Sequence, residues 1–229
     1  MNATAQPMPI EQKPTGSLYM ITVLTVISTV CGLVIVVAYL ATERAIRDNL
    51  ATIAVEAVRE AVPGAAKQVV YTLDASGKLV PASSQTDGQP KWYACYDDAG
   101  NLLAVACEGS GSGYADLIKV LYAYSPDQER ITGFKVLDSK ETPGLGDKIG
   151  SDADFLRNFT NLDASLTPGG ELAHPFEVVK HGTKTQDWQI DAISGATVSS
   201  NAVGKILNES ASKAIPVIHQ NLEQIRSGL

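Results

Sequence analysis

The sequence predicts an α+β fold, with an antiparallel or mixed sheet and helices, behind one N-terminal transmembrane helix. Three observations predict it. Residues 18–41 form an uncharged apolar run, residues from 67 onward alternate with the period of strands, and residues 198–209 have helical spacing. The 229 residues suffice for one domain (65–229) plus an appendage.

After a short N-terminal tail (1–17), residues 18–41 carry no charge, and 19 of these 24 residues are apolar. A bilayer core of ~30 Å needs about 20 helical residues, so the run is long enough to span it. A secretory signal would have an apolar core of ~7–15 residues and a small-residue cleavage site. This run is longer and continues into Thr42-Glu43-Arg44, which indicates an uncleaved anchor.

Residues 42–64 are predicted to form a juxtamembrane helix that packs on the core or acts as a stalk. Its apolar residues recur every three or four positions, and Pro63-Gly64 ends it. The basic residues around the anchor are Lys13 before it and Arg44, Arg47 and Arg59 after it. Taken alone, this count places the C-terminal side in the cytoplasm.

The next segments have strand patterns separated by turn signals. The predicted strands are 69–73, 91–96, 102–107, 118–124, 130–137, 176–180 and 188–193, and the turns or loops are 74–77, 82–90, 98–101, 109–113, 125–129 and 167–170. The glycines of 109–113 are expected to form a flexible turn in which the backbone approaches a ligand. The turn at 98–101 pairs Cys95 with residues near 104, an offset from Cys107 that argues against a disulfide.

Two segments have helical patterns. Residues 152–162 form a short helix-like run, and a longer helix follows position 198. In the longer helix, Val203, Ile206 and Leu207 are expected to pack onto the sheet.

Charge and composition exclude several classes of function. The part after the anchor carries the whole net charge of −7, which argues against nucleic-acid binding, since that needs a basic face. The chain has three histidines and no Cys-x-x-Cys pair, so its spacing does not predict a zinc or iron–sulfur site.

The segment Ser194-Gly195-Ala196-Thr197-Val198-Ser199-Ser200 joins a predicted strand to a predicted helix. The first amides of a helix lack internal partners and the helix dipole favours an anion there, so this junction is suited to a phosphate. The alternative is an ordinary helix cap, because Ser and Thr are preferred capping residues.

The stretch 191–199 resembles the Ser/Thr-Gly-Ala-Thr-x-Ser/Thr signature of the FMN-binding domain family, in which a flavin transferase esterifies the threonine with the FMN phosphate. The sequence Glu141-Thr142-Pro143-Gly144-Leu145-Gly146 resembles that family's second block, which lies against the flavin ring. Gly113-Tyr114 resembles a third block. Members include the G subunit of the Rnf complex and the C subunit of the Na⁺-translocating NADH:quinone reductase.

The resemblance implies a covalent FMN on the Thr197 hydroxyl. The amides of Ala196, Thr197 and Val198 would face the phosphate, Gly195 would keep the approach open, and Ser194 and Ser199 would donate hydroxyls. Lys205 reaches the phosphate or belongs to a solvated helix face. Asp191 helps to position a metal during flavin transfer or caps a backbone turn.

For the flavin ring, the resemblance implies contacts from Glu141, Thr142, Gly144, Leu145 and Gly146. Pro143 and Gly144 favour a tight turn, and Leu145 offers an apolar cover. Tyr114 stacks on the ring or fills the core, and Trp188 is expected in the core.

The expected function is therefore a membrane-anchored covalent flavoprotein subunit that carries electrons in an Rnf-type ferredoxin:NAD⁺ oxidoreductase. Its expected partners are the other membrane and redox subunits and a flavin transferase. The resemblance also implies an inner-membrane protein with its flavin domain on the periplasmic side, opposite to the charge count. Compact length favours the G subunit over the quinone-reductase C subunit. A flavin-free, membrane-tethered assembly module is the alternative from another class.

Overall fold

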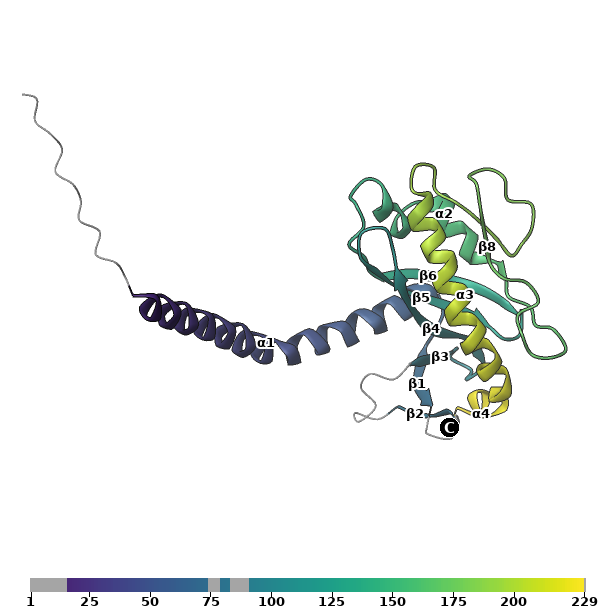
Figure 1. Cartoon of the computed structure of the whole chain (residues 1–229). Coiled ribbons are helices and arrows are strands. Elements are labelled where there is room, and N and C mark those ends of the chain that lie inside the picture. Colours follow the sequence, from purple (N-terminus) through teal and green to yellow (C-terminus); the bar gives the residue numbers. More distant parts are fainter. Residues whose placement is uncertain (1–15, 74–78, 83–90, 229) are drawn as a thin grey trace, which may run out of the picture. The chain divides into compact units, whose positions relative to one another are not determined.

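The computed structural model describes residues 16–73, 79–82 and 91–228, with only the helical backbone for 44–51. The predicted turn at 74–77 and most of the predicted loop 82–90 lie outside the described residues. The α+β prediction is confirmed: Figure 1 shows a β-sheet crossed by a long helix, α3, drawn in yellow-green.

The first helix, α1, spans Ser17–Ala61 without a break. The two helices predicted for 18–41 and 42–64 are thus one continuous helix, because no residue between them interrupts helical hydrogen bonding. Within the described residues, Ser17–Glu43 is the one stretch long and apolar enough to cross a membrane. The chain divides into two compact units at this helix, one ending at Leu50 and the other beginning at Ala51.

The second unit is built on a seven-stranded antiparallel sheet in the order β2-β1-β3-β4-β5-β6-β7. Its strands are β1 (Lys67–Leu73), β2 (Leu79–Pro81), β3 (Trp92–Tyr96), β4 (Leu102–Ser112), β5 (Leu117–Ser125), β6 (Arg130–Asp138) and β7 (Leu162–Asp163). A separate parallel pair joins β8 (Glu177–Val179) to β9 (Gln189–Asp191). The predicted strands 176–180 and 188–193 are thus present but shorter.

The helical segments after the sheet are short except for one. The 3₁₀ turn η1 spans Gly146–Gly150, α2 spans Ala153–Arg157, and η2 spans Asn158–Thr160. The predicted helix 152–162 is therefore split, since its last residues pair as β7 with β6. The long helix α3 spans Thr197–Gln220 and α4 spans Leu222–Ser227.

Both faces of the sheet are buried. One face packs against α3, where Val203, Ile206 and Leu207 are almost fully buried, as predicted. The other face packs against residues 54–62 at the end of α1, through alanines on both sides. Successive side chains in β4 and β5 point alternately to the two faces, as the two-residue period of a strand requires.

Of the turn predicted at 109–113, only Gly113 lies in a turn, where its amide donates to the Asp116 carbonyl at 2.8 Å. Residues 109–112 lie inside β4, where they pair with β5. A Cβ at Gly109 would lie 2.9 Å from the Ile206 side chain, and one at Gly111 would lie 2.7 Å from it. These glycines therefore let α3 approach the sheet, and the close neighbour is a helix instead of a ligand.

The two soluble cysteines lie on adjacent strands. Cys95 pairs with Ala104, as predicted, while Cys107 pairs with Trp92. Both are buried free thiols, on opposite faces of the sheet. Burial raises the pKa of the Cys95 thiol to about 12, so this side chain behaves as a small apolar group.

Candidate functional site

The junction between β9 and α3 is a tight turn. Gly195 has φ +81°, the left-handed region that favours glycine, and the amide of Ala196 donates to the carbonyl of Ile193 at 3.1 Å. The Ser200 hydroxyl fixes the same turn, because it accepts from the Ile193 amide at 3.1 Å and donates to the Ala196 carbonyl at 3.0 Å. The turn therefore brings the chain directly from the strand into the helix.

The capping alternative for this junction is wrong. The N-cap residue of α3 is Ala196, which has no side chain able to accept a hydrogen bond. The amides of Thr197, Val198 and Ser199 are the first three of the helix and have no acceptor within it. Thr197 and Val198 are both exposed. The helix start thus presents donors, and the positive end of its dipole, to the surface.

The second block forms the predicted tight turn. The Leu145 amide donates to the Thr142 carbonyl at 3.1 Å, and Gly144 has φ +77°. Leu145 is 53% exposed although it is apolar. Gly146 is buried, and a Cβ there would lie 2.5 Å from both the Glu141 carboxylate and the Ser199 hydroxyl.

The Glu141 side chain is buried, with 6% of its surface exposed. Its Oε1 accepts from the amides of Tyr114 at 2.8 Å and Ala115 at 3.0 Å, and its Oε2 accepts from the Ser199 hydroxyl. Burial by itself raises the pKa of this carboxyl, but these donated bonds outweigh it, so the pKa lies below its ordinary value. Glu141 is therefore a carboxylate at neutral pH.

These segments enclose a pocket of about 400 Å³, which we call the helix-start pocket. Its lining residues are Tyr114, Glu141, Thr142, Leu145, Gly146, Gly195, Ala196, Thr197, Val198 and Ser199. The fold thus brings together three sequence blocks that lie far apart in the chain. Of the predicted site residues, Ser194 and Gly144 lie outside this lining.

Apolar side chains surround the helix-start pocket at the surface. Tyr114 is 71% exposed, so the alternative that it fills the core is wrong. Val198 and Leu145, which also line this pocket, are large exposed apolar residues too. Such a set of exposed apolar side chains beside unpaired helix amides suits a ligand with a planar apolar part and an anionic tail.

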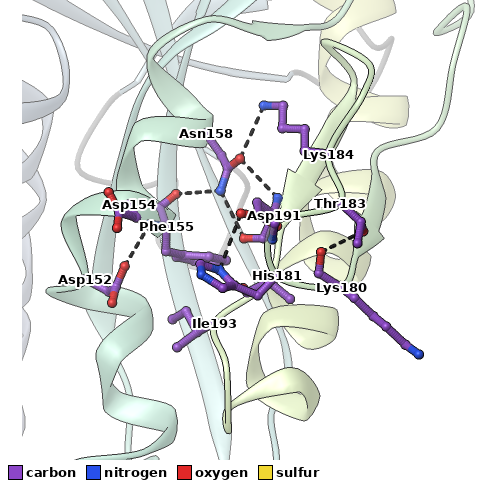
Figure 2. Close-up of polar contacts among 12 residues, drawn as sticks. Asp152, Asp154, Phe155, Asn158, Lys180, His181, Thr183, Lys184, Asp191 and Ile193 are labelled. Atoms are coloured by element: carbon purple, nitrogen blue, oxygen red, sulfur yellow. Dashed lines mark hydrogen bonds and ion pairs between the residues drawn. The ribbon is translucent and has the colours of Figure 1, made fainter.

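A second, smaller hollow of about 190 Å³ lies where β9 runs into the same turn, and we call it the polar hollow. Its lining residues are Lys148, Asp152, Asp154, Phe155, His181, Asp191, Ala192, Ile193 and Ser194. Figure 2 shows the hydrogen bonds that join the side chains here to one another and to the backbone.

Asp191 caps a backbone turn in the polar hollow, which was one of its two predicted roles. Its Oδ1 accepts from the Gly182 amide at 2.7 Å, and its Oδ2 lies 3.4 Å from His181 Nδ1 (Figure 2). Among the described residues, no cluster of three or more His, Cys, Asp or Glu side chains is arranged to hold a metal ion.

Asn158 lies beside the polar hollow and binds Asp191, which lines it. No signal in the sequence indicated Asn158, because a single Asn in a helical pattern is ordinary. Its amide nitrogen donates to the carbonyls of Phe155 and Asp191, at 3.0 and 3.1 Å. Its Oδ1 accepts from the Asp191 amide at 3.0 Å and from Lys184 Nζ at 3.2 Å (Figure 2). Burial lowers the pKa of Lys184.

Two further predictions are decided by exposure. Lys205 lies on the solvated face of α3, with its Nζ 3.8 Å from Glu209, so its solvated alternative is confirmed. The prediction that Trp188 lies in the core is wrong. Trp188 is half-buried, lies just before β9 and stacks on His174, with ring centroids 4.0 Å apart.

Sequence comparison with known proteins gives a matching family model and similar G subunits. The family model for the FMN-binding domain matches residues 113–212. The G subunit of the ion-translocating oxidoreductase complex from Methanosarcina acetivorans is 32% identical over 195 residues, which cover 83% of this chain and 90% of that protein. The G subunit of the proton-translocating ferredoxin:NAD(+) oxidoreductase complex from Clostridium ljungdahlii is 30% identical, over 64% of this chain and 73% of that protein.

Two solved structures have a similar fold. NqrC of Shewanella oneidensis aligns with a TM-score of 0.53 and 22% identity, covering 70% of this chain and 84% of that one. The C subunit of the Na(+)-translocating NADH-quinone reductase from Parabacteroides distasonis aligns with a TM-score of 0.54 and 22% identity, covering 67% and 78%. At this identity the likeness shows the fold alone.

Proposed function

This chain belongs to the family of G subunits of ion-translocating oxidoreductase complexes, and we propose that it is the flavin-carrying subunit of a ferredoxin:NAD⁺ oxidoreductase of the Rnf type. In this role the chain holds one FMN, esterified through its phosphate to the Thr197 hydroxyl. It passes electrons between the other membrane and redox subunits of the complex. The observation that carries the proposal is the helix-start pocket, in which an exposed Thr197 begins α3 beside the two other family blocks.

The residues present fit FMN at both of its ends. At the phosphate end, the amides of Thr197, Val198 and Ser199 have no acceptor within the helix, and no side chain caps them. At the ring end, Tyr114, Leu145 and Val198 offer exposed apolar surface. A pocket of about 400 Å³ with an apolar lining and a few polar groups is typical of a cofactor site.

The protein groups have distinct roles in this site. The helix amides bind the phosphate oxygens, and the dipole of α3 stabilises their negative charge. Leu145 and Val198 exclude water from one part of the pocket, and the Thr142–Leu145 turn fixes the position of Leu145. Bound FMN supplies the electron-carrying chemistry, and the protein supplies position, electrostatics and solvent access.

We further propose that α1 anchors the subunit in the inner membrane and that the flavin domain lies on the periplasmic side. The apolar stretch Ser17–Glu43 supports the anchor. Protease added to intact spheroplasts tests the orientation, since a periplasmic domain is cleaved. Full protection of the domain would reverse the assignment and agree with the positive charges after the span.

The covalent link is tested by the intact mass of protein produced together with a flavin transferase. The wild-type chain should gain one FMN minus one water, on the peptide that contains Thr197. Thr197→Ala should lose this mass entirely and still fold, because Thr197 is exposed. Thr183→Ala is the matched control, since it removes an exposed threonine hydroxyl that donates only to the Lys180 carbonyl in the part of the chain described.

Each result of this experiment has a definite meaning. Flavin retained on Thr197→Ala would refute the assigned linkage. A wild-type chain without flavin absorbance after denaturation would favour the membrane-tethered assembly module instead.

A further inference from the structure

Glu141 lies in the helix-start pocket, but its side-chain bonds go to the protein. Its two carboxylate oxygens accept from the amides of Tyr114 and Ala115 and from the Ser199 hydroxyl. Through these bonds, Glu141 of the second family block is joined to the loop after β4 and to the start of α3. Hydrogen bonds to a charged carboxylate are stronger than those between neutral groups, so the side chain is tightly held. The expected role of Glu141 as a flavin ligand does not account for these contacts.

The neighbouring glycines show how closely the carboxylate is packed. A Cβ at Gly113 would collide with Glu141 Oε1 and would lie 2.6 Å from Ile118 Cδ1. A Cβ at Gly146 would lie 2.5 Å from Glu141 Oε2 and from the Ser199 hydroxyl. Two separate chain segments therefore leave space for this one carboxylate, and larger residues in either segment would displace it.

The charge of this carboxylate is not neutralised by its donors, which are two amides and a hydroxyl. Asp116 and Lys140, the nearby charged pair, bind each other at 2.9 Å and are exposed. A buried charge acts over a longer range than an exposed one, because it is less screened by solvent. Glu141 therefore places a fixed negative charge in the wall of the helix-start pocket.

We propose that Glu141 is a positioning residue that sets the Tyr114 loop against the start of α3, and that its charge disfavours the addition of an electron to the bound flavin. The proposal rests on the proposed function, because the charge acts on FMN. Glu141 acts through the protein that surrounds the cofactor and is not itself a catalytic residue.

The positioning role is tested in protein made without flavin transferase, by hydrogen exchange of the Tyr114 and Ala115 amides. Glu141→Asp keeps the charge but shortens the side chain by one methylene, and should accelerate exchange of these amides about tenfold, since hydrogen bonds to charged groups are strong. Asp97→Asn is the matched control. It alters a carboxylate that holds the Asn101 amide in another turn, at 2.8 Å, outside this pocket, and should leave the two amides unchanged.

The electrostatic role is tested on flavin-loaded protein, by titration with dithionite in the presence of mediator dyes. Glu141→Gln keeps the shape and removes the charge, and should favour the reduced flavin about tenfold, which corresponds to about 59 mV for a one-electron couple. Glu141→Asp should shift the potential less, and Asp97→Asn should leave it unchanged.

The outcomes separate this proposal from the proposed function. Unchanged amide exchange in Glu141→Asp refutes the positioning role, and an unchanged potential in loaded Glu141→Gln refutes the electrostatic one. If Glu141→Asp does not fold, Ser199→Ala removes one donor to the carboxylate and should also accelerate exchange of the two amides, while no acceleration counts against the proposal. A wild-type chain without FMN removes the proposed function and the electrostatic role together, but the exchange measurement still decides the positioning role.

Discussion

The helix-start pocket and the polar hollow lie next to one another along residues 191–199, but their polar groups are used differently. At the polar hollow, the Asp191 carboxylate and the adjacent Asn158 amide bond to neighbouring protein groups (Figure 2). In the helix-start pocket, the first amides of α3 have no acceptor within the helix, and apolar side chains remain exposed. The Asp191 end of the motif thus serves the fold, and the Thr197 end is available to a ligand.

This difference shows why a motif should be read residue by residue. Asp191 and Thr197 belong to one sequence signature and lie six positions apart. Tertiary contacts provide hydrogen-bond partners for the Asp191 carboxylate. Thr197 lies at a helix start, where the first amides have no partner in the helix unless a side chain caps them. A contrast of this kind predicts that substitutions in the two regions affect different properties.

The largest effect on stability is expected from Asn158→Ala, beside the polar hollow. Asn158 is buried, and its removal takes away the side-chain partner of both the Asp191 amide and the Asp191 carbonyl, so the free energy of unfolding should fall by about 2–4 kcal/mol. Denaturant unfolding measures this change. Asn161→Ala, at an exposed asparagine three residues on, should change it by less than about 0.5 kcal/mol. Equal effects of the two substitutions would contradict the structural role of Asn158.

A smaller effect is expected from glycines in the second block. Gly146→Ala places a methyl group against the Glu141 carboxylate and Ser199, which should cost about 1–3 kcal/mol of stability and slow flavin attachment. Gly144→Ala should cost about 1–2 kcal/mol because of its positive φ, but its Cβ meets open space. Flavin attachment to Gly144→Ala should therefore proceed nearly as in the wild type. The time course of flavin fluorescence during maturation compares the two, and equally slow attachment would show that space beside Glu141 is unimportant.

The smallest effect on stability is expected from Tyr114→Ala in the helix-start pocket. Tyr114 is 71% exposed, so the free energy of unfolding should change by less than about 0.5 kcal/mol. In a Thr197→Ala background, the loss of ring stacking should weaken non-covalent FMN binding by about two- to tenfold, as measured by fluorescence titration. Unaltered affinity with unaltered stability would remove Tyr114 from the cofactor site.

The local elements of the fold were predictable to different degrees. The strands on both sides of the 98–101 turn and the start of the last helix follow from alternation and helical spacing in the chain. The glycines of β4 were misinterpreted, because glycine in a strand and glycine in a turn look alike in sequence. No side chain fits at Gly109 and Gly111 because Ile206 of α3 packs against them, and Ile206 lies nearly one hundred residues away in the chain.

The sequence by itself determined the apolar span, the α+β class and the strand-to-helix junction at Thr197, because each depends on short-range periodicity or on the local hydrogen bonding of one segment. Only the tertiary structure decided that Glu141 joins three segments, that Asn158 binds Asp191 and that Tyr114 lies at the surface. Those contacts depend on strand register and on the packing of α3 against the sheet. Such long-range geometry brings distant residues together without leaving a local pattern in the chain.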